Sequence, residues 1–127
     1  MAITAAPVPF TAERFAGWTA RWREPAGCNL LISAVDNYLA RQEVAAAVTA
    51  EGGTWYALDL GNEHHSGQIL MGNATTPKIV RFDKLGLASG IPSPYLQEPD
   101  LLAPPPAGAT PLSCAELTVR EEQSLVV

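Results

Sequence analysis

The fold class depends most on residues 54–60, TWYALDL, because the apolar residues change there from a helical period to alternation. Alternation is typical of a strand. In this strand Tyr56, Leu58 and Leu60 lie on one side, and Trp55, Ala57 and Asp59 lie on the other. Residues 61–67 follow as a polar turn, and residues 68–72 and 78–83 are two more β-type runs. Because the connections are short, we expect a small antiparallel sheet of two to four strands in meander order.

Two N-terminal helices are predicted before this sheet. Residues 11–23 place Phe15, Trp18 and Trp22 on one helical face, and Thr11 is a suitable N-cap. Residues 29–51 form the second predicted helix, which ends at a pair of glycines because glycine enters the left-handed conformation without steric cost. This helix is longer than the average, so the prediction allows a break near its middle, at residue 41.

Proline dominates the segment after the predicted sheet. Residues 86–112 carry seven of the eleven prolines, among them a run of three at positions 104–106. Proline lacks the donor that helix and sheet interiors need, so we expect a long extended arm with polyproline II character. Residues 113–127 then form a short C-terminal helix with a capping-box start, or a strand over residues 116–120. The predicted α+β domain spans residues 1–127, with a compact body over residues 1–85 and the arm over residues 86–112.

Composition and charge exclude several classes of function. The chain has 127 residues and a net charge of −5, without the cluster of Lys and Arg that neutralises a phosphate backbone. Neither a nucleic acid nor an anionic membrane is therefore an expected partner. There is no basic, apolar leader and no apolar run of about 18 residues, so we expect a cytoplasmic protein or part of an intracellularly assembled complex. Cys28 and Cys114 are expected as buried thiols rather than a disulfide.

The segment richest in reactive side chains is Glu63-His64-His65-Ser66. Together with Asp59 or a cysteine these residues offer zinc ligands, but adjacent side chains of a strand point to opposite faces, and the helical His-Glu-x-x-His spacing is absent. Ser66 lacks the flanking glycines of a nucleophile elbow. We therefore predict a solvated turn, with no metal, cofactor or catalytic residue. The alternative is a small metal-dependent or hydrolytic enzyme centred on this loop.

Apolar side chains in the proline-rich segment favour a role in binding. Water penalises such groups when they stay exposed, so a stiff apolar arm is expected to lie against its own domain or a neighbouring subunit. The aromatic stripe of the first helix is expected mostly in the core, with interface contact as the alternative. We predict a non-catalytic assembly or interaction protein, such as an accessory subunit that binds a protein partner or itself; an inhibitor or regulator of another protein is a further alternative. The predicted interaction residues are Trp18, Trp22, Ile91, Tyr95, Leu96, Leu101 and Leu102.

Overall fold

The computed structural model describes residues 5–22, 29–62, 67–76 and 80–105. In chain order the elements are α1 (Ala12–Trp22), β1 (Asn29–Ser33), α2 (Tyr38–Ala50), β2 (Trp55–Asn62), β3 (Gly67–Gly72), β4 (Arg81–Phe82), β5 (Ala88–Gly90), α3 (Pro94–Gln97) and the 3-10 helix η1 (Pro99–Leu102). The predicted α+β class is confirmed.

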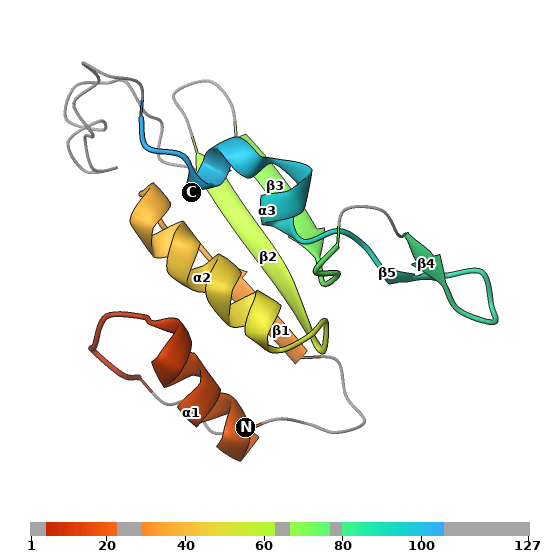
Figure 1. Cartoon of the computed structure of the whole chain (residues 1–127), viewed down its shortest axis with the longest axis horizontal. Helices are drawn as coiled ribbons and strands as arrows, with labels where there is room; N and C mark the ends of the chain where they lie inside the picture. The colour runs from red at the N-terminus through yellow and green to blue at the C-terminus, as the bar shows by residue number, and fades with distance from the viewer. Residues whose placement is uncertain (1–4, 23–28, 63–66, 77–79, 106–127) are drawn as a thin grey trace.

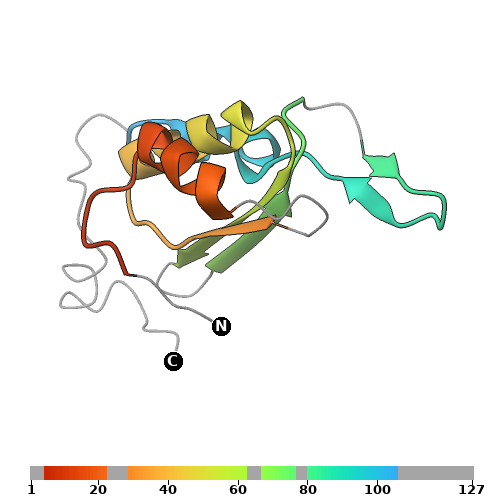
Figure 2. The same cartoon turned by 90° about the horizontal axis from the view of Figure 1, so that it is seen from below.

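The main sheet has three strands in the order β1-β2-β3 (Figure 1). Strand β1 pairs with β2 in parallel, with α2 as the crossover, and β2 pairs with β3 antiparallel. The sheet is therefore mixed. The predicted antiparallel pair of residues 54–60 and 68–72 is confirmed as β2 and β3, but the meander is wrong in its third strand, because β1 rather than residues 78–83 completes the sheet. Helices α1, α2 and α3 all lie over one face of this sheet (Figure 2).

The second predicted helix, over residues 29–51, is wrong in its first part. Its first five residues are strand β1, and α2 begins only at Tyr38, where the side chain of Asn37 accepts a hydrogen bond from the Ala40 backbone N–H at 2.9 Å. A short apolar run suits a helix or a buried strand equally well, and here the backbone pairing with β2 decides between them. The predicted end of the helix is confirmed by Gly52 and Gly53, which have φ values of 62° and 87°.

Helix α1 lies within the predicted residues 11–23 and packs on α2. Its first turn is capped by Thr11, whose hydroxyl accepts from the Arg14 N–H at 3.3 Å. Two side chains of the α2 region hold it in place. The Glu43 carboxylate accepts from the Ala12 N–H at 2.9 Å, and that of Glu51 accepts from the Thr19 hydroxyl at 2.9 Å. The helix is thus joined to α2 at both ends.

The core lies between the sheet and the helices. Its buried centre is formed by Val44 and Val48 of α2, Ala57 of β2 and Tyr95 of α3. Around this centre pack several partly buried apolar side chains, Phe10, Leu31, Ala45, Leu101 and Leu102. The proline-rich segment therefore supplies part of the core.

The expected extended arm over residues 86–112 is wrong for its described part. It contains β5, α3 and η1, and the prolines that seemed to exclude helices, Pro94 and Pro99, stand at the start of α3 and η1. Proline is tolerated there because the first N–H groups of a helix have no partner in the helix. Among the other described prolines of this segment, Pro92 forms an isolated bridge with Ala74, and Pro104 and Pro105 lie in irregular backbone. The predicted C-terminal element, residues 113–127, lies outside the described residues.

A second, two-stranded sheet is formed by β4 and β5, with Arg81 paired to Gly90 and Phe82 to Ala88. The predicted strand over residues 78–83 contributes its end to this pair, whereas residues 77–79 lie outside the described part. We call residues 80–90 the hairpin. In both views it projects away from the rest of the molecule (Figures 1 and 2).

Candidate functional site

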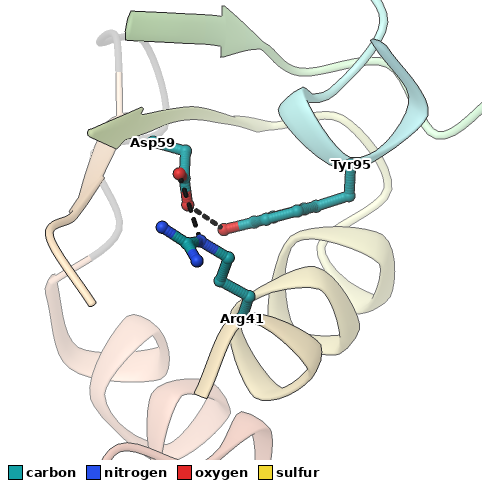
Figure 3. A network of polar contacts seen from close by, with 3 residues as sticks. All are labelled: Arg41, Asp59 and Tyr95. Atoms are coloured by element: carbon teal, nitrogen blue, oxygen red, sulfur yellow. Dashed lines mark hydrogen bonds and ion pairs between the residues drawn. The ribbon is translucent and has the colours of Figure 1, made fainter. Parts of the chain in front are cut away.

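A buried polar cluster joins α2, β2 and α3 (Figure 3). The carboxylate of Asp59 is 0% exposed; it accepts a hydrogen bond from the Tyr95 hydroxyl at 3.0 Å and lies 3.4 Å from Nε of Arg41. A carboxylate removed from water needs such partners, because no solvent remains to stabilise its charge. The cluster therefore ties together three elements that are far apart in the sequence.

Each member reaches the cluster through the local structure of its element. Asp59 is on the side of β2 that faces the helices, and Arg41 projects from the first turn of α2 (Figure 3). Tyr95 comes from the turn of helix that follows Pro94. Ser33 is the β1 residue paired with Asp59, and its hydroxyl oxygen is buried with no hydrogen-bond partner among the described residues.

The cluster is built to hold a proton on the tyrosine. Burial, and then the negative charge of Asp59, raise the pKa of Tyr95 well above its ordinary value. The neighbouring Ser33 hydroxyl opposes this shift, although it makes no hydrogen bond of good geometry. Tyr95 is thus a neutral donor to a buried acceptor. Of the three side chains only Arg41, 14% exposed, reaches the surface, so the cluster acts mainly as a tether between elements.

We expect Tyr95→Phe to change how the free energy of unfolding depends on alkaline pH. The folded state keeps the phenol proton where the unfolded chain loses it, so this stability is present below about pH 10 and falls by about 1.4 kcal/mol per pH unit above it. Urea unfolding from pH 8 to pH 11.5 measures the effect. The wild type should be more stable than the variant at pH 8, and the difference should shrink as the pH rises. A difference that stays constant would contradict the assignment.

The other face of the main sheet is apolar and uncovered by any described helix or loop. The register of the three strands places seven side chains next to one another on this face. Four of them are large and exposed, with Ile32 at 58% and Ile69 at 74%, and those of the central strand are half-buried. None carries a charge. We call this surface the open face, and it consists of Leu30, Ile32, Tyr56, Leu58, Leu60, Ile69 and Met71.

The hairpin is the second apolar surface. Its exposed side chains include Leu85 at 83% and Leu87 at 62%, together with those of Val80 and Phe82. The tip is ordered by Asp83, whose Oδ1 accepts from the N–H groups of residues 85 and 87 at 2.8 and 2.9 Å. Gly86, with φ 76°, takes the left-handed position in this turn. A well-defined turn therefore presents apolar side chains to solvent.

The predicted interaction residues are mostly used within the chain. Tyr95 is buried, and Leu101 and Leu102 pack against the core. Ile91 and Leu96 are half-buried, and the backbone of Ile91 bonds to that of residues 73 and 74. Thus the described part of the proline-rich segment lies against its own domain, which was one of the two predicted alternatives, the other being a neighbouring subunit.

The aromatic stripe of α1 divides in the same way. Phe15 is buried and meets Trp55 edge to face at 4.9 Å, whereas Trp18 is half-buried and contacts Phe10 at 6.3 Å. The side chain of Trp22 lies outside the described part of the chain. The expectation of a core role is confirmed for Phe15.

The reactive loop over residues 63–66, with Glu63, His64, His65 and Ser66, lies outside the described residues, as do Cys28 and Cys114. Asp59, its candidate companion, is engaged by Arg41 and Tyr95. Within the described ranges no three His, Cys, Asp or Glu side chains come together as a metal would require.

The sequence patterns did not predict the open face or the hairpin. A signal for the open face was present in the sequence, since Tyr56, Leu58 and Leu60 occupy every second position of β2. The pattern shows that these three share a side, but not that the helices cover the opposite side. For the hairpin the signal was a pair of turn-forming residues, Asp83 and Gly86, among the apolar Phe82, Leu85 and Leu87, at the start of the proline-rich segment.

Comparisons with protein-family models, with curated proteins and with solved structures find no match to this chain. In the described part of the chain, no helix has the length and apolar character needed to cross a bilayer.

Proposed function

We propose that this protein is a non-catalytic interaction or assembly subunit that docks onto a protein through its open face. One observation carries the proposal: seven apolar side chains form a continuous uncharged surface, on which Ile69 is 74% exposed. Water penalises such a surface, and contiguous apolar patches on soluble domains commonly mark interaction sites. An accessory structural subunit of a larger complex is the role that fits best.

The way the strands divide their side chains supports this proposal. An antiparallel or mixed sheet with one solvated face normally turns its apolar side chains inward and its polar ones outward. Here the helix-covered side of β1 and β2 holds the polar Ser33 and Asp59 as well as Leu31 and Ala57, and the uncovered side holds Ile32 and Leu58. A domain that worked alone would gain nothing from this arrangement. A domain whose sheet is covered by a partner would gain a dry interface.

The proline-rich segment has a different role in this proposal from the one expected of it. Tyr95, Leu101 and Leu102 pack inside the domain, so the segment supports the sheet from the helical side. The sheet is thereby rigid before binding, and a rigid surface loses less entropy on docking. With a net charge of −5 on the chain and no charge on the open face, a protein is a better partner than a nucleic acid or an anionic membrane inside the cell.

We expect the double variant Ile32→Lys with Ile69→Lys to lose the protein that the wild type binds. The two lysine charges would lose their water in an apolar interface that offers them no counter-charge, so we expect about a hundredfold loss of affinity. The matched control is Leu39→Lys, because Leu39 is 58% exposed, as is Ile32, but lies on α2. Tagged wild type, double variant and control are compared by affinity capture from the source cells and by the mass of each purified protein.

A partner or second copy retained by the wild type and by Leu39→Lys, but lost by the double variant, would support the proposal. If the double variant retains everything that the wild type retains, the open face is not a docking surface. Sedimentation of the wild type with phosphatidylcholine vesicles, abolished in the double variant, would contradict a protein partner.

A further inference from the structure

The hairpin is a second exposed apolar surface, and it does not cover the first. Within the described residues β4 and β5 pair only with each other, and both views show the hairpin pointing away from the sheet (Figures 1 and 2). Phe82, Leu85 and Leu87 therefore stay exposed in a single copy, with Leu85 at 83%. The chain thus carries two separate apolar surfaces, the open face and a protruding hairpin.

Several hydrogen bonds connect the C-terminal end of the hairpin to the body of the domain. The N–H groups of Asn73 and Ala74 both donate to the Ile91 carbonyl at 2.8 Å, and the Asn73 side chain accepts from the Ile91 N–H at 3.1 Å. The same side chain donates to the Gly53 carbonyl at 3.1 Å. These bonds join the C-terminal end of the hairpin, next to Ile91, to the body, and Asp83 orders its tip. A preorganised protrusion of this kind suits docking, because little freedom is lost.

We propose that the hairpin of one copy docks on the open face of a second copy, and that the exchange is reciprocal. This proposal rests on the proposed function and names the partner. The two surfaces match in chemistry, since the hairpin presents Phe82, Leu85 and Leu87 beside its charged residues Asp83 and Lys84, and the open face is apolar with no charge to repel an acidic copy. They also match in form, because a two-stranded ribbon can lie across a three-stranded sheet at the ordinary spacing of stacked sheets.

The small size of the open face is the reason to expect two hairpin contacts in the dimer, one from each copy. Three strands about 4.8 Å apart, with six residues at about 3.3 Å each, cover only roughly 300 Å² in plan. A stable interface takes about 800 Å² from each partner, so one such contact is small for a lasting complex. Two copies that exchange hairpins bury both apolar surfaces of each chain about one two-fold axis, which is the commonest symmetry of homo-oligomers.

Charged substitutions in each surface distinguish docking of the hairpin on the open face from pairing of two faces or of two hairpins. Leu85→Lys with Leu87→Lys changes the hairpin, and Ile32→Lys with Ile69→Lys changes the open face; Leu39→Lys is the control. Sedimentation equilibrium at about 1 to 100 µM should show a dimer for the wild type and the control, and at least about tenfold weaker association for each double variant. An equimolar mixture of the two double variants keeps one of the two reciprocal contacts, because one intact hairpin then meets one intact face. The mixture should therefore associate more tightly than either double variant alone and more weakly than the wild type.

Three results would overturn the proposal. A wild type that is monomeric at 100 µM has no such contact. A hairpin variant that still dimerises would mean that faces pair with faces, and a face variant that still dimerises would mean that hairpins pair with hairpins. A monomeric wild type whose open face still captures another protein would overturn only this inference, and the proposed function would stand.

A cross-linking measurement does not depend on how the variants fold. A benzophenone amino acid replaces Leu85, and the labelled protein is mixed with an equal amount of ¹⁵N-labelled wild type. After irradiation, mass spectrometry should find light hairpin peptides joined to heavy peptides of β1 or β3. Cross-links confined to light peptides of the same chain, or to other elements, would contradict the docking of the hairpin on the open face.

Discussion

Replacing Gly72 by alanine is expected to destabilise the protein by about 3 kcal/mol or more, which lowers the Tm by roughly 10 °C. A Cβ at this position would lie 1.8 Å from the carbonyl oxygen of Pro92 and 2.8 Å from that of Ile91. Both neighbours are backbone atoms, so no side-chain rotation can relieve the clash. The segment around Pro92 would have to move away from the end of β3.

That movement would break the connection between the proline-rich segment and the sheet. Beside Gly72, the N–H groups of Asn73 and Ala74 donate to the Ile91 carbonyl, and the Ser93 N–H donates to the Ala74 carbonyl at 3.0 Å. Buried backbone groups left without partners account for much of the expected loss. Amide hydrogen exchange at residues 73, 74 and 93 should be faster in the variant.

Gly17→Ala is the matched control. Gly17 lies in α1, and an added Cβ there meets nothing within 4 Å. Alanine in a helix interior should stabilise the protein by up to about 1 kcal/mol. Thermal unfolding of the three proteins measures both effects. A Gly72→Ala protein with the Tm of the wild type would show that the proline-rich segment does not pack against β3 as described.

Asp59→Ala is expected to lower the free energy of unfolding by about 3–5 kcal/mol. The change removes a fully buried carboxylate and leaves the Arg41 guanidinium, 14% exposed, without its counter-charge. The Tyr95 hydroxyl also loses the acceptor 3.0 Å away. An uncompensated charge and an unpaired hydroxyl are more costly than the missing contact itself.

Urea unfolding followed by tryptophan fluorescence measures this loss. Asp36→Ala serves as control, because Asp36 is an exposed carboxylate in the loop before α2 and should change stability by no more than about 0.5 kcal/mol. The triple variant Asp59→Leu, Arg41→Leu and Tyr95→Phe replaces the cluster by apolar groups and should recover much of the loss. If Asp59→Ala costs no more than Asp36→Ala, the cluster is not a tether.

Both predictions bear on the proposed docking of the hairpin on a second copy. The hydrogen bonds beside Gly72 are those that hold the base of the hairpin, and Tyr95 anchors the segment that follows it. Loosening either one should weaken docking by making the hairpin less ordered, even though neither residue belongs to the open face.

Part of the candidate site could be predicted from the sequence, and part could not. The importance of Tyr95, Leu101 and Leu102 followed from the cost of exposing apolar groups in a proline-rich segment. Their actual surroundings did not, because proline spacing argues against helices, whereas Pro94 and Pro99 stand at the start of α3 and η1. The open face was missed for a related reason. Alternation identifies two sides of a strand but does not say which side the helices cover.

The sequence by itself determined the local features of this protein: α1 with its Thr11 cap, the glycine end of α2, the alternation in β2 and the acidic net charge. These depend on residues a few positions apart, whose interactions exist in any compact state. Tertiary structure alone decided that residues 29–33 form a strand parallel to β2, that Asp59 faces inward and that residues 91–102 complete the core. Each of these depends on pairing or burial between residues far apart in the chain, and local propensity is too weak to choose between the alternatives.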